Sequence, residues 1–383
     1  MAERPSGSLR IFLGSPPALC LSLGRALYCP RVKTNASPPG RGAIANPPTR
    51  FESLRLERDA DWDPDQDPAP RTKFFRDLSQ TVISYNDSPD IPFNASLNPY
   101  RGCEHGCSYC YARPTHEYLG FSAGLDFESR IMVKEDAPEL LRRELSARKW
   151  RPQMLALSGV TDCYQPIERR LQLTRRCLAV LAEFRNPVGI ITKNYLVTRD
   201  LDLLRELAAH RAVMVHLSIN SLDAELARKL EPRASSPRQR LAAVQELAQA
   251  GVPVGVLVAP VIPALNEPEI PAVLAAAKAA GAGWAATEIL RLPLAVAPLF
   301  THWLERTVPE KKDKILGRIR AIRGGKLNDP RFGTRMSGEG IFAEQIARMF
   351  RVAARKAGLA EGGPELSTAS FRKPQGAQLA LGL

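Results

Sequence analysis

Three closely spaced cysteines are the residues best suited to chemistry in this chain. Cys103, Cys107 and Cys110 form a Cys-x3-Cys-x2-Cys run within Asn98-Pro99-Tyr100-Arg101-Gly102-Cys103-Glu104-His105-Gly106-Cys107-Ser108-Tyr109-Cys110-Tyr111. A [4Fe–4S] cluster takes one thiolate per iron, so three cysteines on one loop would bind three irons and leave the fourth open. S-adenosylmethionine (SAM) can chelate an open iron through its amino and carboxylate groups, so that one electron can break its carbon–sulfur bond. Gly102 and Gly106 favour a loop that wraps tightly around such a cluster.

Two other kinds of site fit the same cysteines. A zinc ion would take the three thiolates with His105 or His116 as its fourth ligand, and Cys107 with Cys110 would form a redox pair. A non-catalytic nucleic-acid-binding protein that holds zinc or a cluster therefore stays as the competing function. Anaerobically purified protein would be brown with an iron–sulfur cluster and colourless with zinc. Seven cysteines, three of them bunched in a long chain, indicate metal binding in a reducing, cytoplasmic compartment rather than a disulfide scaffold.

Alternating strands and helices are predicted to hold the cysteine loop. From about Phe93 onward, short β-branched or apolar runs alternate with amphipathic helical patterns. The predicted strands are 93–98, 154–158, 188–192, 213–219, 254–262 and 284–290, and the predicted helices between them are 136–148, 169–184, 200–209, 237–250 and 269–280. Six such units predict a parallel sheet with right-handed crossovers. The periodicity fits an open, partial barrel and a doubly wound sheet equally well.

Polar residues follow the carboxyl ends of these strands, where parallel barrels bind their ligands. In chain order they are Gly159, Thr161, Asp162, Lys193, Asn194, Ser218, Asn220, Pro260 and Ile262. We expect Lys193 to pair with the SAM carboxylate and Ser218 and Asn220 to hydrogen-bond the ribose or the carboxylate. The backbone near Pro260 and Ile262 would flank the adenine, and Tyr109 would pack beside the cluster or the adenine. Loop polarity and helix capping are the alternative roles for Lys193 and Asn220.

The cysteine run, with an aromatic residue before its last cysteine, resembles the signature of the radical SAM superfamily. Within it, the sequence is most similar to the branch related to spore photoproduct lyase, which includes uncharacterised bacterial proteins. The resemblance covers roughly residues 40–357 and rests on Asn98-Pro99-Tyr100-Arg101-Gly102-Cys103, Thr161-Asp162-Cys163-Tyr164-Gln165-Pro166-Ile167-Glu168, Ile191-Thr192-Lys193-Asn194 and Leu230-Glu231-Pro232-Arg233-Ala234. It implies a partial (β/α)6 barrel of the TIM type with the cysteine loop after the first strand. It also implies an enzyme of lyase or transferase type that cleaves SAM to a 5′-deoxyadenosyl radical, which abstracts hydrogen from a substrate, with a nucleic acid or nucleotide as the expected class. A flavodoxin or ferredoxin would supply the electron.

Two features near the second strand depart from the family pattern. Many members carry Gly-Gly-Glu there to hold the SAM amino group, whereas this chain has Ser158-Gly159-Val160-Thr161-Asp162. Spore photoproduct lyase resembles this chain but is thought to use a nearby cysteine as a hydrogen-atom donor, and Gly159 falls nearer to that position than Cys163 does. Cys163 is nevertheless the candidate catalytic residue, with a buried, inert cysteine as the alternative.

Charge and composition divide the chain into three predicted parts. Residues 1–75, rich in Pro, Gly, Arg and Asp, are predicted to be a disordered or extended leader. Ile11–Leu27 is fairly apolar, but prolines and Arg25 interrupt it, so we expect no signal peptide. Residues 76–297 are the predicted barrel, and residues 298–383 are a basic helical extension with helices expected at 298–324 and 341–357.

The net charge of +13 is concentrated near the two ends of the chain. Residues 1–50 carry +6 and residues 311–373 carry +9, which leaves −2 for residues 51–310. The expected nucleic-acid contact is therefore Lys311–Lys373, with Arg318, Arg320, Arg323, Lys326, Arg331 and Arg335 as candidates for phosphate binding. A solvated helix face is the alternative. No apolar run is long enough to cross a bilayer.

Overall fold

The computed structural model describes residues 40–43, 45–51 and 71–374 of the chain. Expectations for the remaining residues, including most of the predicted leader and all of Ile11–Leu27, lie outside this part. Among the described residues, none of the helices has the length and apolar character that a membrane span requires.

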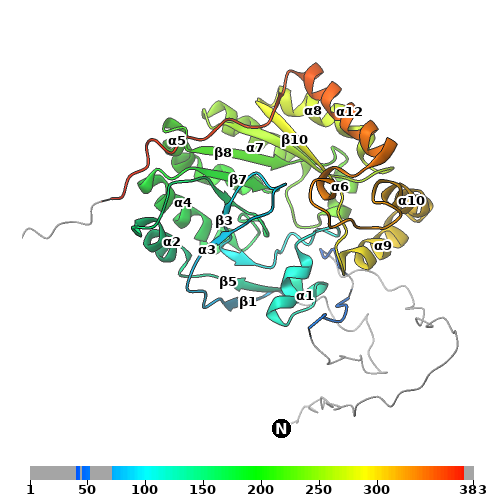
Figure 1. Ribbon diagram of the computed structural model, residues 1–383, viewed down its shortest axis with the longest axis horizontal. Coiled ribbons are helices and arrows are strands. Elements are labelled where there is room, and N and C mark those ends of the chain that lie inside the picture. The colour runs from blue at the N-terminus through cyan, green and yellow to red at the C-terminus, as the bar shows by residue number, and fades with distance from the viewer. Residues whose placement is uncertain (1–39, 44, 52–70, 375–383) are drawn as a thin grey trace, which may run out of the picture. The chain divides into compact units, whose positions relative to one another are not determined.

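A mostly parallel sheet forms the centre of the fold (Figure 1). Its strands lie in the order β11-β10-β9-β8-β7-β6-β3-β2, in which β2 alone runs antiparallel to its neighbour β3. The bounds are β2 Ile83–Tyr85, β3 Ala95–Leu97, β6 Leu155–Leu157, β7 Val188–Thr192, β8 Val213–Ser218, β9 Val254–Val261, β10 Trp284–Ile289 and β11 Ala360–Glu361. The parallel strands follow one another in sequence order without the reversal of a doubly wound sheet. The order decides for the partial barrel, and it confirms the six predicted strands.

Helices after each strand cover the outer face of the sheet (Figure 1). They are α2 Ala137–Ser146, α4 Leu173–Phe184, α5 Leu201–Ala209, α7 Pro237–Gln249 and α8 Ile270–Ala279. The short helices α3 Glu168–Leu171 and α6 Ala224–Leu230 lie in the connections that follow β6 and β8. The continuous helix expected at 169–184 is interrupted at Gln172, whose φ of 50° lies in the left-handed region. Helix α7 begins with a capping box between Ser236 and Gln239. Leu, Val and Ile side chains from these helices and the strands fill one core.

A small second sheet supports the cysteine loop. Its order is β1-β5-β4, with bounds Lys73–Arg76, Arg130–Val133 and Tyr100–Arg101. The 3₁₀ helix η1 Arg113–Leu119 and helix α1 Leu125–Ser129 lie between β4 and β5 in the chain. The cysteine loop therefore begins directly after β4 of this small sheet, and η1 and α1 follow it in the chain.

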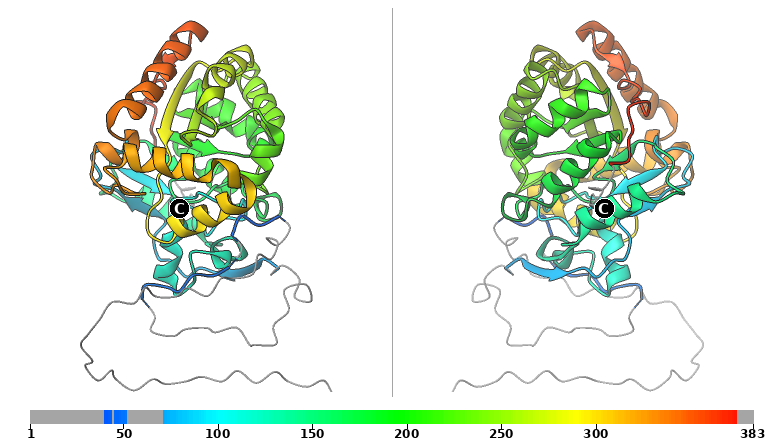
Figure 2. Two further views of the ribbon diagram at one scale, coloured as in Figure 1. Left: turned by 90° about the vertical axis from the view of Figure 1, so that its right-hand side faces the viewer. Right: turned by 90° about the vertical axis from the view of Figure 1, so that its left-hand side faces the viewer.

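The C-terminal region is helical, as expected, and is joined to the barrel at several points. Helices α9 Val296–Thr307 and α10 Lys312–Ile322 replace the single pattern at 298–324, and short α11 Thr334–Ser337 precedes α12 Gly340–Ala357. Helix α12 packs on α8, and β11 extends the main sheet beside β10. Figure 2 shows α12, in orange, beside this edge of the sheet.

Candidate functional site

The cysteine loop turns sharply at two glycines. Gly102 and Gly106 have φ values of 80° and 65°, which disfavour any residue with a side chain. A Cβ on Gly102 would lie 2.8 Å from the carbonyl oxygen of Phe127, and one on Gly106 would lie 2.4 Å from Oε2 of Glu128. Both positions therefore require glycine, because α1 lies directly against the loop.

A buried ion pair between Arg113 and Glu128 holds the loop from behind. The two side chains are fully buried and 3.0 Å apart, and Arg113 also donates two hydrogen bonds to the carbonyl oxygen of Cys107, at 3.0 and 2.9 Å. The carboxylate of Glu128 accepts from the backbone amides of Gly42 at 3.0 Å and Ala43 at 2.8 Å. Residues 40–43 are thereby tied to the loop, although they precede it by about 60 positions. Loss of either partner would leave an uncompensated charge in the interior, which lowers the stability of the fold. The pair therefore holds the loop only while both side chains are present.

Apolar side chains of α9 and α10 back the loop from another direction. Cys107 and Tyr109 belong to a second core cluster that includes Phe300, Trp303 and Ile319. The indole of Trp303 donates to the carbonyl oxygen of Lys229 at 3.0 Å, which fixes α9 to the end of α6. Helices α9 and α10 therefore support the cysteine loop from behind without lining the pocket.

One pocket lies between the cysteine loop and the carboxyl ends of the strands. Cys103, Cys107 and Cys110 all line it, and none of them forms a disulfide. The other predicted site residues that line the pocket are Tyr109, Thr161, Asp162, Lys193, Ser218 and Pro260. Cys163, Asn220 and Ile262 do not line it. The structure thus brings together nine of the twelve predicted side chains around one space.

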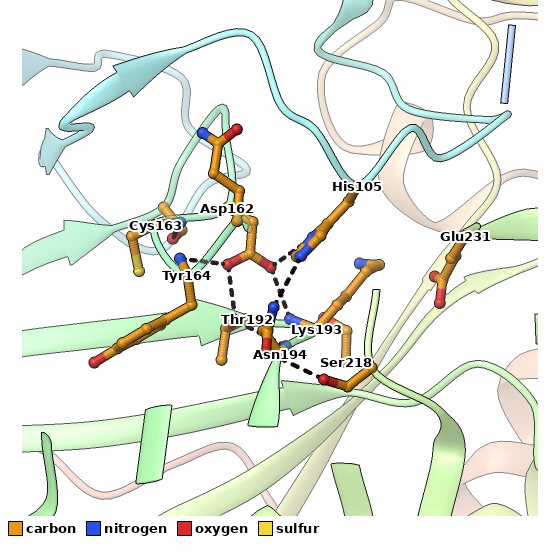
Figure 3. A network of polar contacts seen from close by, with 12 residues as sticks. His105, Asp162, Cys163, Tyr164, Thr192, Lys193, Asn194, Ser218 and Glu231 are labelled. Atoms are coloured by element: carbon orange, nitrogen blue, oxygen red, sulfur yellow. Dashed lines mark hydrogen bonds and ion pairs between the residues drawn. The ribbon is translucent and has the colours of Figure 1, made fainter. Parts of the chain in front are cut away.

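Asp162 is the centre of a polar network at the pocket wall (Figure 3). It accepts hydrogen bonds from the backbone amide of Lys193 at 2.8 Å and the hydroxyl of Thr192 at 2.8 Å, and its Oδ2 lies 3.3 Å from Nδ1 of His105. Burial lowers the pKa of His105, but the charges of Asp162 and Cys103 outweigh it and raise the pKa to about 10. Burial raises the pKa of Asp162, but His105 outweighs it and holds that pKa at about 2. The network joins the cysteine loop to the end of β7.

A second network joins Tyr109 to the end of β8. The Tyr109 hydroxyl donates to Glu231, whose carboxylate also pairs with Arg240. Arg240 donates in turn to the carbonyl oxygen of Ser218 at 2.9 Å. Burial raises the pKa of Glu231, but Arg240 and Lys193 lower it more, so the net shift is downward. Glu231 was not among the predicted site residues, although it stands in the Leu230-Glu231-Pro232 stretch.

Several polar groups at or near the pocket have no partner among the described residues. The ammonium of Lys193 forms no hydrogen bond or ion pair within the described residues, and the hydroxyl of Ser218 and the amide oxygen of Asn220 are buried and unpaired there. Buried polar groups normally find partners, so the Ser218 hydroxyl fits a polar ligand in the pocket, as does the half-buried cation of Lys193, whereas Asn220 does not line that space. Three thiols beside a cation and a hydroxyl suit a cluster with SAM.

The mouth of the pocket contains three residues that the strand-end argument did not name. The ring of Tyr111, whose hydroxyl donates to the carbonyl oxygen of Gly159 at 2.8 Å, is covered by Arg291 at 4.5 Å. Arg291 also lies 3.1 Å from Glu288. Burial raises the pKa of Glu288 despite the charges of Arg291 and Lys193. Glu288 lies near the carboxyl end of β10 and Arg291 follows that strand, so extending the same rule to the sixth strand would have found them.

Cys163 lies in the main core with no exposed surface. Burial raises the pKa of its thiol, as does the nearby charge of Asp162. Its backbone amide donates to the Ser158 hydroxyl at 2.8 Å. The position is that of a packed cysteine, and the wall of the pocket beside it is formed by Ser158.

Both histidines considered as zinc ligands have other contacts, although His105 lines the same pocket as the three thiols. His105 contacts Asp162 and, at 3.3 Å, the amide nitrogen of Asn194, while His116 packs among the rings of Phe121 and Phe127. Across the ranges that the structure describes, no three His, Cys, Asp or Glu side chains are grouped to hold a single metal ion. The three thiols around one pocket fit a polynuclear cluster better, since each binds a different iron.

Internal contacts occupy several of the basic residues predicted to meet phosphate. Arg323 is buried and donates to four carbonyl oxygens, including those of Ile289 and Leu290. Arg335 pairs with Asp90, and Arg331 pairs with Asp329 and Glu339. Arg318 lies over the ring of Phe342. Arg320 and Lys326 are exposed and have no side-chain partner among the described residues.

Comparisons with known proteins agree with this geometry. Residues 97–277 match the radical SAM superfamily. An uncharacterised protein of Mycobacterium tuberculosis is 39% identical over 222 residues, which are 57% of this chain and 65% of that protein. One from Methanocaldococcus jannaschii is 32% identical over 173 residues, 45% of this chain and 62% of that protein. The match thus spans less than two thirds of these relatives.

The fold is shared with solved structures of spore photoproduct lyase. One with bound AdoMet and dinucleoside spore photoproduct superposes with a TM-score of 0.53 at 19% identity, covering 75% of this chain and 80% of that one. The likeness confirms the barrel, and the superfamily match covers the cysteine loop and the pocket-lining residues from Cys103 to Pro260 but not those of β10 and beyond. The part of the chain at residues 97–277, with its cysteine loop, thus matches the radical SAM superfamily, and the fold around it is that of spore photoproduct lyase.

Proposed function

We propose that the protein is an enzyme that binds a [4Fe–4S] cluster through Cys103, Cys107 and Cys110 and cleaves SAM reductively. The observation that carries the proposal is that the three thiols share one pocket with Lys193 and Ser218. When bound, the cluster would supply one electron to SAM, whose carbon–sulfur bond breaks to give methionine and a 5′-deoxyadenosyl radical.

The residues of the pocket have distinct roles in this proposal. Lys193, which has no partner within the described chain, binds the SAM carboxylate. Ser218 binds a SAM hydroxyl or carboxylate oxygen, because its own hydroxyl is buried and unpaired. Asp162 orients His105 and the amide of Lys193 rather than binding the SAM amino group, since its oxygens are already occupied. Pro260 and Tyr109 form apolar walls.

A nucleotide-containing substrate is the class that we propose for hydrogen abstraction. It is supported by the likeness in fold to spore photoproduct lyase, which has been solved with a dinucleoside spore photoproduct. The substrate would enter at Tyr111, which is 44% exposed and lines the pocket. Glu288 and Arg291 offer a hydrogen-bonding acid and a cation beside that entrance.

The decisive experiment is anaerobic reconstitution with iron and sulfide followed by incubation with SAM and dithionite. We expect about four irons per chain and formation of 5′-deoxyadenosine, measured by mass spectrometry. Colourless protein that retains zinc instead, or brown protein that leaves SAM intact, would contradict the proposal.

A further inference from the structure

An acid and a cation stand side by side at the mouth of the pocket, at the carboxyl end of β10. Nε of Arg291 lies 3.1 Å from Oε1 of Glu288, and both residues line the pocket. The guanidinium carbon of Arg291 lies 4.5 Å from the centre of the Tyr111 ring, and the Tyr111 hydroxyl donates to the carbonyl oxygen of Gly159 at 2.8 Å. These contacts hold the acid and the cation between the end of β10 and the residues that follow β6.

The two side chains keep most of their hydrogen-bonding capacity. Oε1 of Glu288 is buried and has no hydrogen-bond partner among the described residues, although Arg291 lies close to it. The contacts of Arg291 in this part of the chain are that ion pair and the ring of Tyr111. The side chains of Arg291 and Glu288 are only 15% and 23% exposed, so little water can take the place of a partner. Polar groups this enclosed normally find partners, which indicates a polar ligand.

The other cations whose charge acts on Glu288 are engaged elsewhere. Arg323 donates to four backbone carbonyl oxygens, Arg335 pairs with Asp90, and Lys193 is the residue that we assign to the SAM carboxylate. Burial raises the pKa of Glu288 despite all the cations around it. Hydrogen-bond donors on a ligand would therefore stabilise the ionised carboxylate beyond what the protein itself provides.

Guanine is the nucleobase whose edge complements this acid and this cation. Its N1–H and its N2 amino group are two adjacent donors, and O6 and N7, which follow them around the ring system, are two adjacent acceptors. A carboxylate accepts through two oxygens and a guanidinium donates through a planar fork, so Glu288 and Arg291 together present the reverse order. Adenine and cytosine carry one amino group, and thymine carries one ring N–H, so none of these bases offers two adjacent donor groups.

We infer that Glu288 and Arg291 select a guanine base in the substrate. The inference rests on the proposed function, because it takes the substrate to be a nucleotide that enters at Tyr111. Glu288 accepts from N1 and N2 of the base, and Arg291 donates to O6 and N7. Tyr111 is a positioning residue, because its ring holds the guanidinium in place. No covalent bond changes in this step, so the two side chains determine which nucleotide binds and not how SAM is cleaved.

The test measures the binding of mononucleotides that share one sugar and one phosphate and differ in the base. Reconstituted protein with SAM bound and no reductant is titrated by equilibrium dialysis with the 5′-monophosphates of deoxyguanosine, deoxyadenosine, deoxycytidine and thymidine. We expect the guanine nucleotide to bind more tightly than the other three, on the order of tenfold. The hypoxanthine nucleotide lacks the N2 amino group and the 7-deazaguanine nucleotide lacks N7, so both should bind more weakly than the guanine nucleotide.

Single substitutions assign the two contacts. Glu288→Gln replaces one acceptor oxygen by a donor, so it should abolish the preference for guanine over hypoxanthine and keep the iron content. Arg291→Met removes the donors at similar length, so it should abolish the preference for guanine over 7-deazaguanine. The matched control is Glu310→Gln, at an exposed position of the 3₁₀ helix η4 Pro309–Lys311 that does not line the pocket. It should bind all the nucleotides as wild type does.

Four results would each overturn the inference: equal binding of the four nucleotides, preference for another base, no measurable binding, or a preference over hypoxanthine that survives in Glu288→Gln. If a variant loses its iron, the analogues decide on wild-type protein alone, and equal binding of guanine and hypoxanthine nucleotides overturns the inference. Failure of wild type to cleave SAM with dithionite would instead refute the proposed function. The two failures are distinguishable, because base preference is measured without reductant.

Discussion

At the scale of single residues, the pocket and the residues behind it include two kinds of polar side chain. Asp162 and Glu231 are saturated with internal partners, which fix the loops around the pocket. Lys193 and Ser218 have no side-chain partner among the described residues. The first kind holds the loops in position, and the second is available to a ligand. Substitutions of the first kind should therefore disturb the loops, whereas substitutions of the second kind should weaken ligand binding.

The motif cysteines should each be required for the cluster. We expect Cys103→Ala, Cys107→Ala and Cys110→Ala to lose the broad absorbance that thiolate-bound iron–sulfur clusters give at about 400 nm, because each removes the thiolate of one iron. Cys177→Ala is the control, since Cys177 lies in the main core and does not line the pocket. It should keep its iron at some cost in stability. A Cys107→Ala protein with four irons that still cleaves SAM would refute the assignment.

Lys193 should matter for SAM and not for iron. Lys193→Ala should retain the cluster but weaken SAM binding by about 1.5–3 kcal/mol, the usual loss for a charge-assisted hydrogen bond. Calorimetric titration of reconstituted protein measures this directly. Lys326→Ala, at an exposed position away from the pocket, serves as the control. An unchanged dissociation constant would mean that Lys193 is an ordinary loop lysine.

At the scale of elements, the segment at residues 40–43 acts as a clamp on the cysteine loop. A Cβ on Gly42 would lie 1.7 Å from the carbonyl oxygen of Gly106. Gly42→Ala should therefore displace the clamp, at a cost of roughly 1–3 kcal/mol, and lower the amount of iron that survives desalting. Gly317→Ala, where nothing lies within 4 Å, is the control and should keep its iron. Equal iron retention in the two variants would show that the loop does not depend on the clamp.

Two truncations separate the leader from the clamp. Residues 1–38 have no periodic apolar pattern, so their deletion should leave melting temperature and SAM cleavage intact. Deleting residues 1–43 also removes the amides of Gly42 and Ala43 that bind Glu128. We expect the longer deletion alone to lose the cluster. A large drop in melting temperature for the shorter one would contradict the prediction for the leader.

The elements that sequence reasoning predicted well share a physical reason. The strands at Val188–Thr192 and Val254–Val261 are continuous apolar or β-branched runs, which mark buried parallel strands within a few residues. The break at Gln172 and the antiparallel β2 lacked such a signal. Among site residues, the strand-end rule found Lys193 and Ser218 but could not find Glu128, because its role depends on Arg113 and Gly42, which only the folded chain brings together.

At the scale of the whole molecule, nucleic-acid binding depends on the basic side chains that are exposed and have no internal partner among the described residues. Arg323 is buried, so its reversal would disturb folding and cannot test binding. We expect Arg320→Glu/Lys326→Glu to weaken oligonucleotide binding and to flatten its dependence on salt, because fewer counterions are released. Gel shifts at two salt concentrations measure both effects. The control Arg148→Glu/Lys149→Glu, at two exposed positions shortly before β6, should bind as wild type, and equal binding by both variants would point to another surface or to a substrate without phosphate.

The packing of Cys107 against Phe300 and Ile319 has a consequence for biosynthesis. The ribosome makes the cysteine loop about 200 residues before it makes the helices that cover it. At a synthesis rate of about 5–20 residues per second, the cysteine loop of the nascent chain lacks that apolar cover for roughly 10 to 40 seconds. A cluster inserted in this interval would be open to oxygen, and one inserted afterwards must pass the pocket mouth. We therefore expect iron and sulfide to enter through the pocket mouth after α10 has left the ribosome, when the apolar cover is in place.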